Sequence, residues 1–171
     1  IDPKMGFTRQ ELTSGKLLSF ISYKSLLPVL CKCATDMATA RDYHRANNQQ
    51  HDERYLGQLI QTIEKKYGAS GNVFKFKNLE GCSLCNGRGT KGLTMVAEMM
   101  MPDDKWLDIA AQGNDRAAVR YWRSTYSDKR FDSPNMDGKL IAEHALYKAI
   151  LGRIDPRHIE TWGPLDQMET V

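Results

Sequence analysis

The stretch from Cys82 to Gly89 carries the strongest chemical signature of the chain. Its two cysteines, Cys82 and Cys85, have the Cys-x-x-Cys spacing, and glycines follow them at once. Two thiolates at this spacing can bind one metal ion from a tight turn, and glycine lets the backbone fold beneath the sulfur atoms. We therefore expect this stretch to form a metal-binding knuckle.

A second close pair, Cys31 and Cys33, lies upstream and completes the four cysteines of the chain. Four cysteines in two close pairs are typical of a structural zinc site, which is closed, four-coordinate and rich in sulfur. No open coordination position is suggested, so no catalytic role is expected for the thiols. The sequence predicts one structural zinc ion with the ligands Cys31, Cys33, Cys82 and Cys85.

Two other interpretations of this region stay open from the residues alone. The site has either lost its metal, or it uses His44 or His51 in place of one sulfur ligand. The run Gly87–Gly92 is rich in glycine and basic, a composition that also suits a phosphate cradle. Shaping the metal turn is the favoured role for these glycines.

A nucleotide-binding phosphate loop needs Gly-x-x-x-x-Gly-Lys-Ser/Thr between a strand and a helix. The chain has two Gly-Lys pairs, Gly15-Lys16 and Gly138-Lys139, and neither has the earlier glycine or the following hydroxyl residue. We therefore expect this stretch to bind no ATP by itself.

The composition of the 171 residues is that of an ordinary soluble protein, with 41% hydrophobic residues and a net charge of +3. This charge is too balanced to indicate a nucleic-acid partner. No apolar run approaches the length of a membrane span, so a cytoplasmic location is expected. The opening Ile1-Asp2-Pro3 lacks the usual methionine, which suggests a fragment of a longer protein.

Periodicity and capping signals predict a mainly helical α+β fold. One helix is expected over Leu12–Leu30, and two helical pieces are expected within Thr35–Tyr67. The strands Val73–Lys77 and Leu93–Met101 are expected to form a small antiparallel piece that bears the cysteine turn and is surrounded by helices. Further helices are expected at Asp103–Ala111, Asn114–Tyr126, Gly138–Leu151 and Asp155–Trp162.

The order of these features resembles the C-terminal part of the ATPases of type II secretion and type IV pilus assembly. The resemblance is specific over Gly81–Thr94, where Cys-x-x-Cys leads through glycines into an apolar strand with Glu98. It continues into the helix that starts at Asp103-Asp104. It is looser at Asp137-Gly138-Lys139 and at Asp155–Trp162, and overall it spans about Phe7 to Trp162.

The resemblance implies that this chain is the end of a cytoplasmic, hexameric motor. The parent's ATP, Mg²⁺ and catalytic boxes would lie upstream, so the chain would contain no catalytic residue. The implied partners are the inner-membrane platform protein and other subunits, with no nucleic acid. The implied regions are 1–30, the end of the motor's helical part; 31–101, a cysteine subdomain with a polar insert; and 102–171, a C-terminal helical region.

The chain departs from the family pattern at several positions. Thr90 stands where the family has tyrosine, Leu93 where it has arginine, and the upstream pair is Cys-x-Cys. These departures suggest a divergent branch, such as the ATPases of type IVb or conjugative thin pili. The knuckle also resembles one repeat of the J-protein chaperones. The alternative function is therefore a stand-alone zinc knuckle that binds nucleic acid or a client protein through Arg88, Lys91, Arg120 and Arg123.

Overall fold

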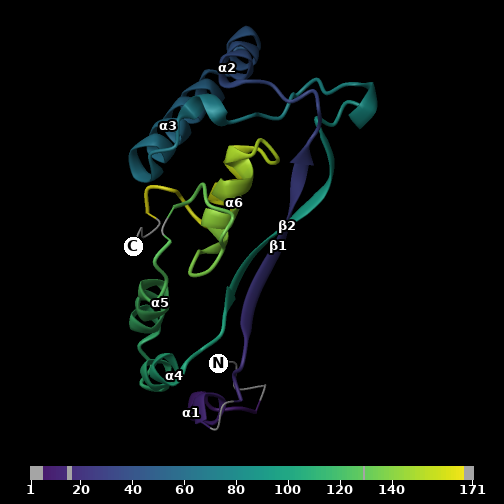
Figure 1. The fold of residues 1–171 in the computed structure, drawn as a ribbon. Coiled ribbons are helices and arrows are strands. Elements are labelled where there is room, and N and C mark those ends of the chain that lie inside the picture. Colours follow the sequence, from purple (N-terminus) through teal and green to yellow (C-terminus); the bar gives the residue numbers. More distant parts are fainter. Residues whose placement is uncertain (1–5, 15–16, 129, 168–171) are drawn as a thin grey trace.

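The computed structural model describes residues 6–14, 17–128 and 130–167, so Ile1-Asp2-Pro3 and Gly15-Lys16 lie outside the described part. The chain has the expected α+β architecture, mainly helical, with one two-stranded antiparallel sheet (Figure 1). In chain order the elements are α1 (Arg9–Thr13), β1 (Ile21–Leu30), α2 (Met37–Ala46), α3 (Gln50–Tyr67), η3 (Gly71–Val73), η4 (Ser83–Cys85), β2 (Thr90–Met100), α4 (Asp104–Ala111), α5 (Asp115–Ser124), α6 (Ile141–Ile150) and η5 (Pro156–Trp162).

The sheet pairs β1 with β2 over almost their whole length. Ile21 lies opposite Met100 and Pro28 opposite Leu93, and the register becomes irregular between Pro28 and Leu30. The predicted helix over Leu12–Leu30 is therefore wrong, because most of this range is a strand. Pro28 disfavours a helix interior, where it removes a hydrogen bond, but it is tolerated where the N–H of a strand points off the sheet.

The other predicted strand, Val73–Lys77, is also wrong. Its first residue ends the short helix η3, and only Phe76 forms a bridge, exchanging backbone hydrogen bonds with Thr35 at 2.8 and 2.9 Å. The alternating pattern still describes burial, because Phe74 and Phe76 are buried in the core while Val73 is exposed. Two buried aromatic side chains anchor this segment without a partner strand.

The predictions downstream agree better with the structure. The strand predicted at Leu93–Met101 is β2, and the polar insert forms the two helices α2 and α3, with Gly68 ending α3 at φ 68°. Asp103 caps α4 through its side chain, as expected at the start of this helix. The helix expected from Gly138 starts later, at Ile141, because the side chain of Glu143 accepts a hydrogen bond from the Leu140 N–H and fixes the first turn there.

Helix α6 is the centre of the core. Its buried side chains Ala145, Leu146 and Ala149 belong to one apolar cluster with Leu27 of β1 and Val96 of β2. Figure 1 shows the larger helices on one side of the twisted hairpin. Among the described residues, no helix has both the length and the apolar composition that crossing a bilayer requires.

Side chains of α6 also satisfy the outer edge of β2. The Ala97 N–H donates a hydrogen bond to Nδ1 of His144 at 3.0 Å, and Lys148 Nζ donates to Oγ1 of Thr94 at 2.7 Å and to the Met95 carbonyl. Accepting this bond requires a bare Nδ1, while a protonated Nδ1 would instead donate to the Ala97 carbonyl, which lies 3.1 Å away. Burial outweighs this carbonyl contact and lowers the pKa of His144 below its ordinary value, which favours the neutral ring.

We expect this histidine to make the fold sensitive to mild acid. An unfolded histidine takes a proton near pH 6.5, while the folded His144 resists it, so below about pH 6.5 the unfolded state binds more protons and stability falls. Urea unfolding at pH 7.5 and 5.5 should show this fall, and the His144→Asn variant should show a shallower one. His158, whose pKa burial also lowers, remains in both proteins. Equal pH dependence in the two proteins would argue against this role of His144.

Candidate metal centre

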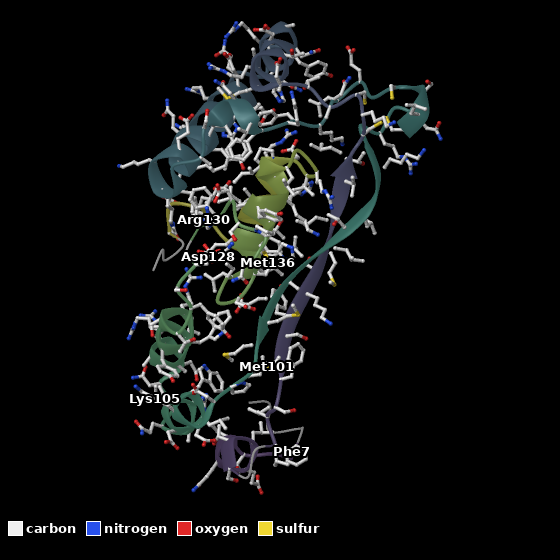
Figure 2. All side chains as sticks on the ribbon, viewed as in Figure 1. Phe7, Met101, Lys105, Asp128, Arg130 and Met136 are labelled. Carbon is white, nitrogen blue, oxygen red and sulfur yellow. The ribbon has the colours of Figure 1, made fainter. Side chains whose placement is uncertain are left out.

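The fold brings all four predicted cysteines together at one end of the hairpin. Their sulfur atoms lie within 4.8 Å of one another, and Figure 2 shows sulfur gathered there, far from the labelled Phe7 and Met101. The Sγ atoms of Cys31 and Cys82 are 3.7 Å apart, those of Cys33 and Cys85 are 3.9 Å apart, and those of Cys82 and Cys85 are 3.8 Å apart. These spacings exclude disulfides, whose sulfur atoms lie about 2 Å apart.

The spacing fits a tetrahedral metal. Zinc–sulfur bonds are about 2.3 Å long, which places neighbouring sulfurs of a tetrahedron about 3.8 Å apart. Three of the six sulfur–sulfur distances lie within 0.1 Å of this value, and no pair exceeds 4.8 Å. Cys31 and Cys85 are buried and the other two cysteines are partly buried, so the cluster is largely closed to solvent. The four thiols therefore form a candidate metal-binding site.

The upstream pair is placed by the end of β1. The Cys31 N–H donates to the Gly89 carbonyl at 3.0 Å, which ties the end of β1 to the segment that leads into β2. A turn then returns the chain, with the Ala34 N–H donating to the Cys31 carbonyl at 2.9 Å. This turn brings Cys33 back to the cluster, so a Cys-x-Cys pair supplies two sulfurs to the same site.

The downstream pair is placed by the knuckle, which we define as residues 81–89. Its short helix η4 ends at Asn86 in the left-handed region, with φ 51°. Gly81 and Gly89 also have positive φ values, 65° and 69°. At Gly81 a Cβ would lie 2.3 Å from the carbonyl carbon of Gly87, and at Gly89 it would lie 2.2 Å from the carbonyl oxygen of Asn78. Only glycine fits these two positions.

The knuckle also directs backbone N–H groups at one sulfur. Cys82 and Gly89 donate their N–H groups to Sγ of Cys85 at 3.2 and 3.1 Å. Burial alone would raise the pKa of this thiol, but the two backbone donors and the neighbouring thiols of Cys82 and Cys31 outweigh it and lower the pKa of Cys85 to about 6. At Cys33, burial and the neighbouring thiols instead raise the pKa to about 12. The knuckle thus favours the thiolate form of Cys85, which is the form that binds a metal.

The histidine alternatives are not supported by the geometry. His44 is buried on α2, where Nδ1 lies 2.7 Å from Oε1 of Gln49, and His51 is largely exposed beside Asp52. Neither belongs to the cluster of candidate ligands found in the described part of the chain. For Gly87–Gly92, the donation from Gly89 to sulfur favours the metal turn over a phosphate cradle.

Replacing Gly81 with alanine is expected to destabilise the knuckle by about 3 kcal/mol, from left-handed backbone strain and overpacking together. Gly92 offers a matched control: its φ is also positive, at 82°, but a Cβ there would meet no atom within 4 Å. Gly92→Ala should therefore cost only the backbone part, about 1–2 kcal/mol. Urea unfolding of both variants tests this, and equal losses would show that the contact with Gly87 does not matter.

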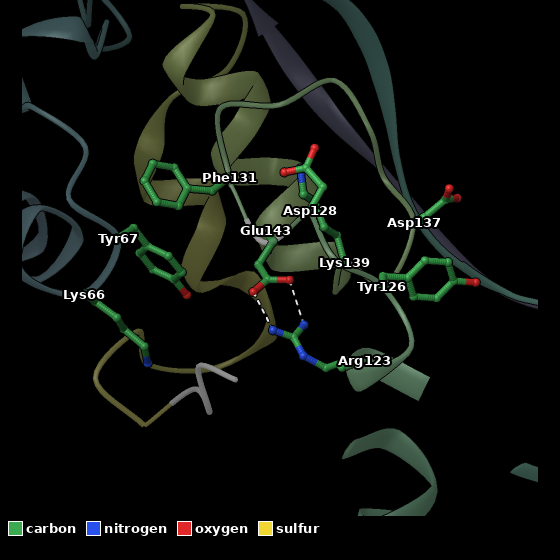
Figure 3. Close-up of a pocket in the computed structure, with 10 residues that line it drawn as sticks. Lys66, Tyr67, Arg123, Tyr126, Asp128, Phe131, Asp137, Lys139 and Glu143 are labelled. Carbon is green, nitrogen blue, oxygen red and sulfur yellow. Dashed lines mark hydrogen bonds and ion pairs between the residues drawn. The ribbon is translucent and has the colours of Figure 1, made fainter. Parts of the chain in front are cut away.

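A second polar cluster lies in a pocket of about 150 Å³ beside α3, α5 and α6 (Figure 3). Arg123 on α5 and Glu143 on α6 form a bidentate ion pair at 2.7 and 2.8 Å, with both side chains nearly buried. Lys139 donates to the Ser133 carbonyl at 2.9 Å, and Lys66 donates to the Leu165 carbonyl at 2.6 Å. These pairings indicate a structural role that joins the helices.

Sequence patterns identified the four thiols but missed the donors that surround them. The signal for Gly81 and Gly89 was their position on either side of Cys-x-x-Cys, which suits a tight turn around a sulfur atom. The chain matches none of the known protein families with which it was compared, and none of the curated proteins.

Proposed function

We propose that Cys31, Cys33, Cys82 and Cys85 bind one zinc ion with a structural role. The observation that carries this proposal is the spacing of the four sulfur atoms, which suits the edges of a tetrahedron around one zinc ion. All four ligands come from the protein, so the site leaves no position for a reactive water molecule. Its chemistry is cross-linking, not catalysis.

The zinc would fasten one end of the hairpin. Cys31 follows the last residue of β1, and the knuckle directly precedes β2. Residues 34–81 intervene between the two cysteine pairs, and the two strands they separate must pair in one register. A metal that binds both pairs closes this long connection and reduces the conformational entropy of the unfolded chain, in the way that a cross-link does.

For the biological role, we propose the C-terminal, non-nucleotide-binding part of a hexameric ATPase that powers pilus assembly or type II-like secretion. Support comes from the order of features: a knuckle, then a strand that carries Glu98, then a helix capped by Asp103. In this role ATP and Mg²⁺ bind in the upstream part of the parent. The parent is a cytoplasmic homo-hexamer held at the inner membrane by its platform protein.

The alternative is a stand-alone zinc knuckle for nucleic acid or a client protein. It depends on a shared surface of Arg88, Lys91, Arg120 and Arg123. Arg123 is only 4% exposed and forms the ion pair with Glu143, so it is a poor candidate for a surface contact. Arg88 belongs to the knuckle and Lys91 follows it closely, whereas Arg120 lies on α5. We therefore favour the motor proposal.

Two assays on the 171-residue chain test the motor proposal. It should bind zinc and hydrolyse no ATP, since the catalytic parts are assigned upstream. Sustained ATP hydrolysis by the purified chain would contradict this assignment. Binding to single-stranded nucleic acid that weakens steeply with salt would support the alternative instead, because such binding depends on contacts with phosphates. Charge reversal at Arg88 and Lys91 would then identify the surface.

A further inference from the structure

The direction of the backbone groups in β1 can be worked out from β2. The Ala97 N–H donates to His144, so it points away from β1, and the facing residue Lys24 must point its own groups away from β2. Residues two apart in a strand share this direction. Ser22, Lys24 and Leu26 therefore direct their N–H and C=O groups to the outer edge of β1.

Two further residues agree with this direction. The Leu30 N–H donates to the Arg153 carbonyl at 2.8 Å, outside the sheet. Pro28 lies two residues after Leu26, so its missing N–H would also point to the outer edge of β1. A strand tolerates proline at such an edge position. The outer edge of β1 is thus satisfied at Leu30 and lacks a donor at Pro28. Across Ser22–Leu26 it has no partner among the residues that the structure describes.

The outward face of the hairpin beside this edge is apolar. Its exposed side chains are Leu26, Leu93, Met95 and Met99, each between 45% and 63% exposed. Lys24 lies in the same face and forms no ion pair within the described ranges, and no carboxylate occupies an outward position of either strand. The helices instead cover the opposite face, which contains Leu27 and Val96.

We propose that the outer edge of β1, from Ser22 to Leu26, pairs with an extended strand of a partner protein that places a carboxylate beside Lys24. Such a strand would receive main-chain hydrogen bonds from three residues, the usual basis of β-strand addition. The partner residue two positions from this carboxylate would lie on the same face, beside Leu26. Pro28 limits the pairing at one end, because the partner finds no donor there.

Other occupants fit this surface less well. A lipid surface suits the apolar side chains and Lys24, but it cannot satisfy a row of backbone N–H and C=O groups. A second copy paired through the same edge would bring two Lys24 side chains close together, and like charges across a strand pair are destabilising. The proposal concerns a surface away from the cysteines, so its failure would leave the zinc and motor proposals untouched.

A peptide of four Val-Glu repeats, acetylated and amidated, serves as the probe, and four Val-Lys repeats serve as its control. In the zinc-loaded chain the Glu peptide should bind at least about tenfold more tightly than the Lys peptide, and Lys24→Glu should reverse this preference. Leu26→Pro should weaken binding of the Glu peptide, because it removes an outward donor. Leu26→Val keeps the donor and should bind as the wild type does.

Amide hydrogen exchange of the wild-type chain provides a second test, in which no substitution can disturb the fold. Tyr23, Ser25 and Leu27 should be protected from the start, while Ser22, Lys24 and Leu26 should exchange rapidly until the Glu peptide slows them at least about tenfold. The proposal is overturned if these three amides are unaffected by the peptide. It is also overturned if their protection depends on protein concentration alone, or if anionic vesicles bind Lys24 and Leu26 while the peptide does not.

Discussion

Replacing Cys82 with serine should remove the bound metal and lower the free energy of unfolding by several kcal/mol. Structural zinc contributes about 10–16 kcal/mol of apparent binding free energy in small zinc-dependent domains. The loss should be smaller here, because α6 and its apolar neighbours form a core that does not depend on the cysteines. Urea unfolding in the presence of zinc, followed by circular dichroism, measures the difference.

Ser83→Ala is the matched control for this variant, since Ser83 lies in the same turn and is exposed. It should keep both the metal and the wild-type midpoint. A strong chelator should destabilise the wild type and Ser83→Ala but leave Cys82→Ser unchanged, because that variant has no metal to lose. A chelator effect of equal size in all three proteins would mean that stabilisation comes from another source.

Replacing Arg123 with methionine is expected to cost about 3–5 kcal/mol, because it leaves the carboxylate of Glu143 buried without its partner. The side chains of Arg123 and Glu143 are only 5% and 13% exposed. Substituting both residues by methionine should restore part of the loss, because no charge is then buried, although the Leu140 N–H also loses its acceptor on Glu143. The midpoint of urea unfolding of the three proteins provides the comparison.

The pair between Arg9 and Asp115 is the control on the surface. Its side chains are 36% and 70% exposed, so solvent screens the attraction. Arg9→Met should therefore change stability much less than Arg123→Met does. If the two substitutions cost the same, or if the double variant at 123 and 143 is no more stable than the single one, the buried pair does not join the helices as described.

The cysteines and the downstream helices could be predicted from sequence because their signals are local. Cys-x-x-Cys with flanking glycines specifies a tight turn by itself, and Asp103 caps α4 through its own side chain. The α+β class followed from the same local patterns. None of these inferences required knowledge of which distant segments meet.

The identity of β1 could not be predicted in this way. Residues 17–27 have apolar side chains at helical spacing, but from Ile21 onward pairing with β2, far along the chain, makes the segment a strand. The strand predicted at Val73–Lys77 was wrong for a different reason. Its alternating pattern reflects the burial of Phe74 and Phe76, and among the described residues this segment forms a single bridge and no strand pair. The convergence of Cys31 with Cys82 is likewise a product of β1–β2 pairing.

The most direct test of the central claim is the zinc content of the chain purified without chelator, measured by elemental analysis alongside single serine variants of the four cysteines. The proposed site predicts about one zinc ion per wild-type chain, bound with tetrahedral thiolate geometry when cobalt is substituted, and a loss of metal in each variant. A wild-type chain that contains no zinc and takes up none on addition would contradict the claim.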